Sequence, residues 1–253
     1  MKDDIGNRMK DFYESRTRIF LPRRTYTIIR VDGKAFHTYT RGLNIPFDKK
    51  FMDNMDKTSC YMCENIQGAQ FAFVQSDEIS ILLTDFKKLG TSAWFDGNVQ
   101  KMVSVSSSMA TSKFNQLMTR LFDEKGSFQT LHSMQLAEFD SRVFTIPSSV
   151  EVENYFIWRQ MDTIRNSISS VAQSLYSSKQ LYGKNTTEMQ DMCIEKNVNW
   201  NDFPVKEKRG RLITREIYDK DGAIRSRWIS EEPPIFTQDR ERLGELIPKL
   251  DML

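Results

Sequence analysis

The chain has 253 residues, 39% of them hydrophobic, which is enough to bury a real core and is typical of a globular protein. Lys and Arg total 36 and Asp and Glu total 34, so a net charge of +2 restricts any nucleic-acid-binding surface to local clusters. The sequence shows neither a transmembrane run nor a signal-peptide start, and its three cysteines argue against a disulfide framework. We therefore expect a cytoplasmic protein that does not bind membranes.

The first pattern along the chain is a strand followed by a helix. Residues 26–31 (YTIIRV) are β-branched and aromatic, and they stop at Asp32-Gly33, where a strand end and a loop are expected. From Asp48 to residue 66, apolar positions recur at helical spacing, and Asp48 itself is a suitable helix N-cap. The sequence therefore predicts a strand, a loop and then a helix.

A hairpin, a second helix and a further strand come next. Residues 70–75 and 79–83 are β-type runs joined by residues 76–78 (SDE), a separation that favours a hairpin. Residues 98–122 follow a helical period, and residues 134–146 return to extended character. The order β-α-β-β-α-β is that of the ferredoxin-like arrangement, an α+β fold in which an antiparallel sheet carries two helices on one face.

The remainder of the chain is helical and then basic. A long helix is expected from about residue 152 to residue 178, and residues 212–218 and 224–229 are typical of a small β-hairpin. We expect two regions, 1–150 and 151–253, with the second packed on the first. The apolar stripe predicted for the long helix comprises Trp158, Met161, Ile164, Ile168, Val171 and Leu175. A polar row on its other side comprises Arg159, Asp162 and Asn166.

Two carboxylates stand at predicted strand ends. Asp32 ends the first strand and Asp77 lies at the hairpin tip, and in a ferredoxin-like sheet these places are close together. Two Asp side chains with the carbonyl of Gly33 are hard oxygen ligands that suit Mg²⁺ and leave positions for water and phosphate. Two such ions would favour phosphoryl transfer. From spacing alone, the same residues also fit ordinary turns, because Asp and Gly dominate turns.

Three sequence motifs, found in order along the chain, give more information than the positions of Asp32 and Asp77 alone. They are residues 30–37 (RVDGKAFH), residues 75–78 (QSDE) and residues 155–166 (YFIWRQMDTIRN). Together they resemble the motifs of the histidine-tRNA guanylyltransferase superfamily. The resemblance implies that region 1–150 is a catalytic core like the palm of conventional polymerases. It also implies an enzyme that adds nucleotides to the 5′ end of tRNA in the 3′-to-5′ direction.

The resemblance implies roles for individual residues. Asp32, the carbonyl of Gly33 and Asp77 correspond to ligands of two Mg²⁺ ions, and Glu78 is expected beside them as a third catalytic carboxylate. The predicted nucleotide-binding residues are Asp32, Gly33, Lys34, Ala35, Phe36, His37, Ser76, Asp77, Lys101 and Asn166. The predicted RNA-binding residues are Arg159, Arg165, Lys206, Lys208, Arg209, Arg211 and Arg215.

Several of these assignments have alternatives. Lys101 also fits a solvated helix residue, and Arg159 could form a salt link with Asp162 in place of an RNA contact. The basic residues between Lys206 and Arg215 could be a solvated strand face, or they could track the phosphate backbone of tRNA.

The chain also departs from the family pattern. Ile164 stands where eukaryotic members have the His of a His-Ile-Asn sequence, and Ile45 replaces a family Lys before Pro46. The chain therefore resembles the guanylyltransferase-like branch, which is associated with template-directed repair of 5′-truncated tRNA. The alternatives are addition of G to histidine tRNA, a palm-type nucleotidyl cyclase and a non-catalytic tRNA-binding protein.

The resemblance also implies a reaction and its partners. ATP adenylylates a 5′-monophosphate on tRNA, and the 3′-hydroxyl of GTP or another NTP then displaces AMP. Family members are commonly tetramers, so we expect a homo-oligomer.

Overall fold

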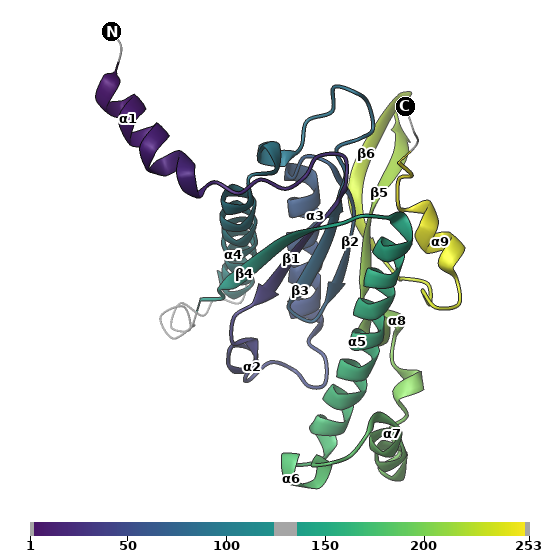
Figure 1. Cartoon of the computed structure of the whole chain (residues 1–253). Coiled ribbons are helices and arrows are strands. Elements are labelled where there is room, and N and C mark those ends of the chain that lie inside the picture. The colour runs from purple at the N-terminus through teal and green to yellow at the C-terminus, as the bar shows by residue number, and fades with distance from the viewer. Residues whose placement is uncertain (1–2, 124–135, 251–253) are drawn as a thin grey trace.

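The computed structural model of the chain describes residues 3–123 and 136–250 (Figure 1). The start of the predicted strand 134–146, at residues 134 and 135, lies outside these ranges. In chain order the helices and strands are α1 (Asp4–Phe12), β1 (Tyr26–Gly33), α2 (Phe36–Tyr39), α3 (Lys49–Asn65), β2 (Ala69–Gln75), β3 (Glu78–Leu83), α4 (Val99–Asp123), β4 (Phe139–Ile146), α5 (Ser149–Leu175), α6 (Ser178–Leu181), α7 (Thr186–Glu195), α8 (Val205–Arg209), β5 (Arg211–Lys220), β6 (Ala223–Glu231) and α9 (Arg240–Glu245).

The strands form one six-stranded sheet in the order β4-β1-β3-β2-β5-β6, and every neighbouring pair is antiparallel. The first four strands with α3 and α4 confirm the predicted ferredoxin-like palm arrangement. The C-terminal hairpin is not a separate element, because β5 pairs with β2 and continues the same sheet. The two predicted regions thus share one sheet, and a functional boundary at residue 150 stays a prediction.

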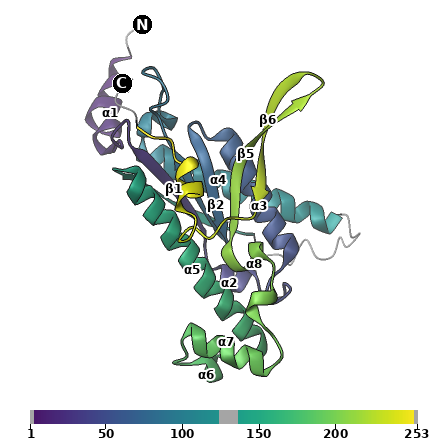
Figure 2. The ribbon, with the colours of Figure 1, turned by 90° about the vertical axis from the view of Figure 1, so that its right-hand side faces the viewer.

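The sheet is covered on both faces, whereas the sequence predicted helices on one (Figure 2). Alternate strand residues explain this. Ile29 and Val31 of β1 pack with the core under α3 and α4, while Ile28 packs with Phe156 of α5 on the opposite face. On this opposite face, α5 leaves β4 and the C-terminal end of β1 less covered than the middle of the sheet (Figure 1).

The apolar stripe predicted for α5 is wrong in its first half. Trp158 and Met161 are 47% and 50% exposed, and Arg159 is buried in their place. The reason is that α5 packs on two partners. Its first half presents Val152 and Phe156 to the sheet, while the predicted stripe becomes buried only further along, where α5 meets α7.

Among the helices of the residues that the structure describes, none is long and apolar enough to cross a membrane.

Candidate active site

The structure brings Asp32 and Asp77 together at one edge of the sheet. Val31 is opposite Ile79 in the β1–β3 register, so Asp32 lies beside the two-residue turn that joins β2 to β3. A Cβ built on Gly33 would lie 2.6 Å from Oδ2 of Asp77. The same Cβ would lie 2.3 Å from the ring of Phe36, so glycine lets the backbone pass close to both side chains.

The two loops that form this edge contain strained backbone. Ala35 has φ 54° and Ser76 has φ 44°, both in the left-handed region that side chains other than glycine rarely adopt. Each such residue costs on the order of 1–3 kcal/mol and persists only where its surroundings hold it. The buried Phe36 supplies that support in the first loop, because its ring packs against Phe51, Phe114 and Phe139. Phe36 was predicted to bind nucleotide, but its side chain belongs to the core.

The carboxylate of Asp77 is in a setting that disfavours its charge. Burial, and to a smaller degree the charges of Asp32 and Glu78, raise its pKa to about 6 against the lowering effect of the hydrogen bond from Ser76. A divalent cation would remove this penalty. Among the residues described, no three His, Cys, Asp or Glu side chains are arranged to hold a metal. Two carboxylates and a carbonyl nevertheless fit Mg²⁺, which commonly takes one or two protein carboxylates and completes its shell with water and phosphate.

Glu78 and Arg159 form a buried ion pair behind this edge. Nε and Nη2 of Arg159 donate to the two carboxylate oxygens of Glu78 at 2.8 and 2.6 Å, and both side chains are under 10% exposed. Arg159 also reaches Asp162 at 3.1 Å, the salt link that the sequence left open. In this structure the side chain of Arg159 is buried and held by Glu78, and its predicted RNA contact stays a prediction. Glu78 anchors the turn that carries Asp77.

A cavity of about 440 Å³ adjoins Asp77. Its walls are the turn between β2 and β3, the second half of α5, α8 and the loop from Thr40 to Asp48. Ser76, Asp77 and Asn166 line it, as their nucleotide-binding prediction requires, although that role stays a prediction. The sequence reasoning missed the loop. The polar residues that follow Asn166 on the same side of α5 could have indicated the cavity; they are Ser169, Ser170 and Gln173.

The other residues predicted for nucleotide binding lie further out. Lys34 and His37 are exposed, and Lys34 pairs with Glu138 at 2.6 Å. Lys101 is in the first turn of α4 beside Phe95, next to the segment that precedes β1. Asp32 is at the opposite end of β1, so within one chain Lys101 lies away from the paired carboxylates, and its nucleotide-binding role stays a prediction.

Most of the predicted basic cluster is engaged in holding the fold. Lys208 is buried and donates to the carbonyl of Asn201, and the buried Arg211 pairs with Asp56 at 2.7 Å. Lys206 donates to the carbonyl of Ser230. These bonds tie α8 and β5 to their neighbours, although Arg211 also lines the cavity and its Nη2 has no hydrogen-bond partner among the described residues; RNA binding by Lys208 and Arg211 stays a prediction.

Three of the predicted basic residues remain accessible. Arg165 and Arg215 are exposed and Arg209 is partly so. Arg165 pairs with Asp162 at 2.6 Å, and Arg215 lies over the ring of Trp228. An RNA contact by these three stays a prediction.

A palm-like antiparallel sheet with paired carboxylates beside a nucleotide-sized cavity defines the class, a palm-type nucleotidyltransferase. A family model described as "Thg1: tRNAHis guanylyltransferase" matches residues 6–147, and the chain belongs to this family of tRNA nucleotidyltransferases.

Solved structures and curated relatives agree with this membership. A bacterial tRNA(HIS) guanylyltransferase (Thg1)-like protein in complex with ATP is 45% identical, with a TM-score of 0.82 over 96% of this chain and 99% of that one. A complex described in the same words but with GTP gives 45% and 0.81 over the same shares. The tRNA(His) guanylyltransferase of Saccharomyces cerevisiae is 29% identical over 78% of this chain and 85% of its own length. An uncharacterized protein of Acanthamoeba polyphaga mimivirus is 29% identical over 89% and 82%.

Proposed function

We propose that this chain adds nucleotides to the 5′ end of tRNA in the 3′-to-5′ direction. The observation that carries the proposal is the convergence of Asp32, Gly33 and Asp77 beside the cavity, in a chain of this family. Asp32, Asp77 and the carbonyl of Gly33 would hold Mg²⁺. When bound, the ion supplies charge neutralisation for phosphate and lowers the pKa of an attacking hydroxyl.

The protein's own groups would position the nucleotide. Ser76 and Asn166 offer a hydroxyl and an amide to the cavity, and the Glu78–Arg159 pair fixes the turn from which Asp77 projects. A Thg1-like relative has been solved with ATP and with GTP, which supports ATP for activation and GTP or other NTPs for addition. The name of the S. cerevisiae relative supports tRNA as the acceptor.

We propose further that addition follows a template strand in the tRNA. Ile164, in place of the family His, packs with the apolar cluster between α5 and α7. It therefore offers no hydrogen bond to a nucleotide, and base pairing is left to select the base.

The test is incubation with 5′-truncated, 5′-monophosphorylated tRNA, ATP, all four NTPs and Mg²⁺. The tRNAs differ only in the base opposite the missing nucleotide, and the products are sized and sequenced. We expect each product to carry the Watson–Crick complement. Addition of G to every tRNA would contradict the template rule, and no extension of any of them would contradict the proposed function.

Self-association, expected as a tetramer, stays a prediction. Helix α1 projects from the body in Figure 1 and has no buried residue. Its Ile5, Met9 and Phe12 lie at helical spacing and are all exposed, so their burial against another copy of the chain would stabilise an assembly.

A further inference from the structure

Two arginines stand opposite each other on the sheet face beside α5. Arg30 of β1 is in register with Arg142 of β4, and two residues further along Asp32 is in register with Asp140. Strand side chains alternate, so all four project from the same face. Like charges directly opposite each other on neighbouring strands destabilise a sheet. The arrangement of Arg30 and Arg142 therefore needs an explanation.

Neither arginine is well neutralised by the protein. Nε of Arg30 is buried without a hydrogen-bond partner in the part of the chain that the structure describes. Arg142 is exposed, and its approach to Asp140 is 3.8 Å, too long for a hydrogen bond. Buried donors are satisfied in most proteins, so a guanidinium with a buried, unsatisfied Nε beside a second guanidinium indicates a place for an anion.

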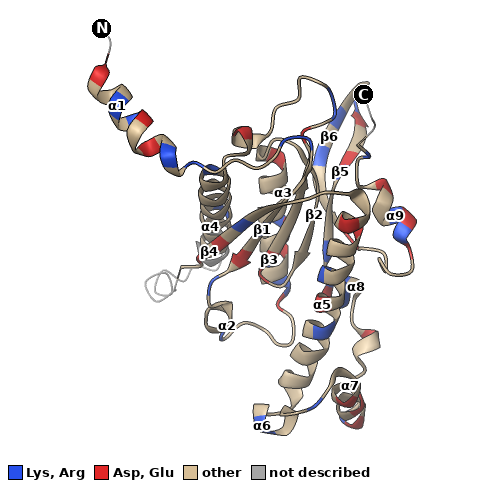
Figure 3. Ribbon diagram, in the orientation of Figure 1, with Lys and Arg blue, Asp and Glu red and all other residues tan. Residues whose placement is uncertain are grey.

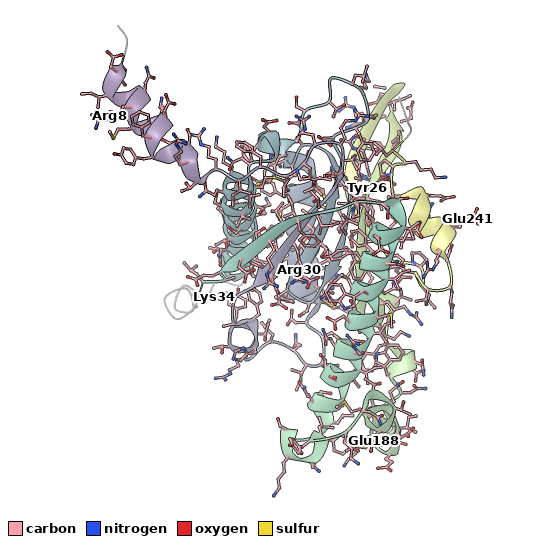
Figure 4. All side chains as sticks on the ribbon, in the orientation of Figure 1. Arg8, Tyr26, Arg30, Lys34, Glu188 and Glu241 are labelled. Carbon is pink, nitrogen blue, oxygen red and sulfur yellow. The ribbon has the colours of Figure 1, made fainter. Side chains whose placement is uncertain are left out.

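The carboxylates beside the pair neutralise it only in part, since Asp140 approaches Arg142 at 3.8 Å and Asp32 is two residues from Arg30 along β1. Ser80 is opposite Arg30 on β3, and it hydrogen-bonds to the hydroxyl of Tyr155. Glu78, the acidic residue on β3, already accepts hydrogen bonds from Nε and Nη2 of Arg159. Figure 4 shows Arg30 on the face of the sheet next to α5, and Figure 3 shows basic and acidic residues together on β4.

The location of the pair suggests which anion it would take. The cavity lies toward β2 and β5, whereas Arg30 and Arg142 lie on β1 and β4, so Asp32 and Asp77 are between the two. Two residues along a strand span roughly 7 Å, so the spacing between Arg30 and Asp32 leaves room for about one phosphate group. The exposed Trp158, whose ring lies 5.8 Å from that of Tyr155, offers a surface on which a terminal base could stack.

We infer that Arg30 and Arg142 form a phosphate site that receives the 5′-terminal phosphate of the RNA, across the carboxylates from the incoming nucleotide. This inference rests on the proposed function. The same chemistry would also fit the polyphosphate of an NTP, so the test must separate the two sources.

The test is binding of an RNA hairpin without NTPs, measured by fluorescence anisotropy. We expect a 5′-monophosphate hairpin to bind wild-type protein about tenfold more tightly than its 5′-hydroxyl counterpart, since a charge-assisted hydrogen bond is worth at least that factor. Arg142→Gln should reduce the ratio to about one and leave ATP and GTP affinity unchanged. Arg242→Gln, at an exposed arginine of α9, is the control and should keep the full ratio.

An unchanged ratio in Arg142→Gln would overturn the inference, and so would a loss of ATP or GTP affinity, which would assign the pair to the nucleotide. Because this measurement involves no nucleotide addition, a protein that fails to extend tRNA can still discriminate the 5′-phosphate. The site and the proposed function can thus fail separately.

Thermal unfolding gives a second readout. If Arg30 and Arg142 repel each other, Arg142→Gln should melt at a higher temperature than wild type, and inorganic phosphate should raise the melting temperature of wild type more than that of the variant. A lower melting temperature with an unchanged phosphate effect would show that Arg142 is structural and overturn the inference.

Discussion

The two faces of the sheet are built on different principles. The face under α3 and α4 is closed by apolar side chains such as Ile29, Met62 and Phe114. The face under α5 buries an ion pair, Glu78 with Arg159, among its aromatic residues and leaves the end of β1 open. Burying charges costs desolvation free energy and adds little net stability. The ion pair on the face under α5 therefore indicates a place where positioning functional groups matters more than stability.

The largest effect should come from the open end of the second face. Asp32→Ala and Asp77→Ala each remove a proposed Mg²⁺ ligand, which supplies several kcal/mol of charge stabilisation, so we expect nucleotide addition to fall by at least about 10³-fold. Asp140→Ala, at the exposed carboxylate opposite Asp32, is the matched control and should retain activity within about threefold.

Circular dichroism should show that all three variants fold, because these carboxylates lie at strand ends and outside the apolar clusters. Normal activity in either the Asp32 or the Asp77 variant would contradict the metal assignment.

An effect of intermediate size is expected at the buried pair. Arg159→Ala leaves Glu78 charged and unpaired in a buried place, so we expect the free energy of unfolding to fall by about 3–5 kcal/mol. The double variant Glu78→Gln, Arg159→Met should cost less than Arg159→Ala alone, because it leaves no orphaned charge. The exposed pair of Arg242 and Glu245 is the control, and Arg242→Ala should cost under about 1 kcal/mol.

Urea denaturation of the four proteins measures these differences. A loss for Arg159→Ala as small as that for Arg242→Ala would mean that the pair is solvated and that α5 does not clamp the turn.

The difference between the two faces of the sheet also explains which elements the sequence could predict. Helices α3 and α4 and the strands between them follow simple periods, because one face of each helix is apolar and packs into one core, formed by a single face of the sheet and the two helices. Asp32 and Asp77 could be paired because strand order fixes where strand ends meet. Both inferences depend on local pattern and topology alone.

The errors come from places where tertiary contacts override the local pattern. A basic residue on a helix normally predicts an exposed face, but Arg159 is turned inward by Glu78, which is 81 residues away in the chain. Lys101 was assigned because it falls where the resembled family has a Lys, and sequence position does not show which end of α4 meets the site. Asp48 in the loop from Thr40 to Asp48 was explained as a helix N-cap, and no local pattern showed that the loop folds over the cavity.

The smallest effect should be that of Trp158→Ala, which tests the orientation of α5 directly. Trp158 belongs to the predicted apolar stripe, yet it is 47% exposed and contacts mainly Arg159 and Tyr155. A cation–π contact at an exposed site is worth about 0.5–1 kcal/mol, so the free energy of unfolding should fall by no more than about 1 kcal/mol. Phe156, two residues earlier, is fully buried with its ring 4.5 Å from that of Phe71, and Phe156→Ala should cost about 3–5 kcal/mol. Urea denaturation of the two variants side by side is the measurement. Equal losses would show that both aromatic residues are in the core, which no single rotation of α5 against the sheet in this structure allows.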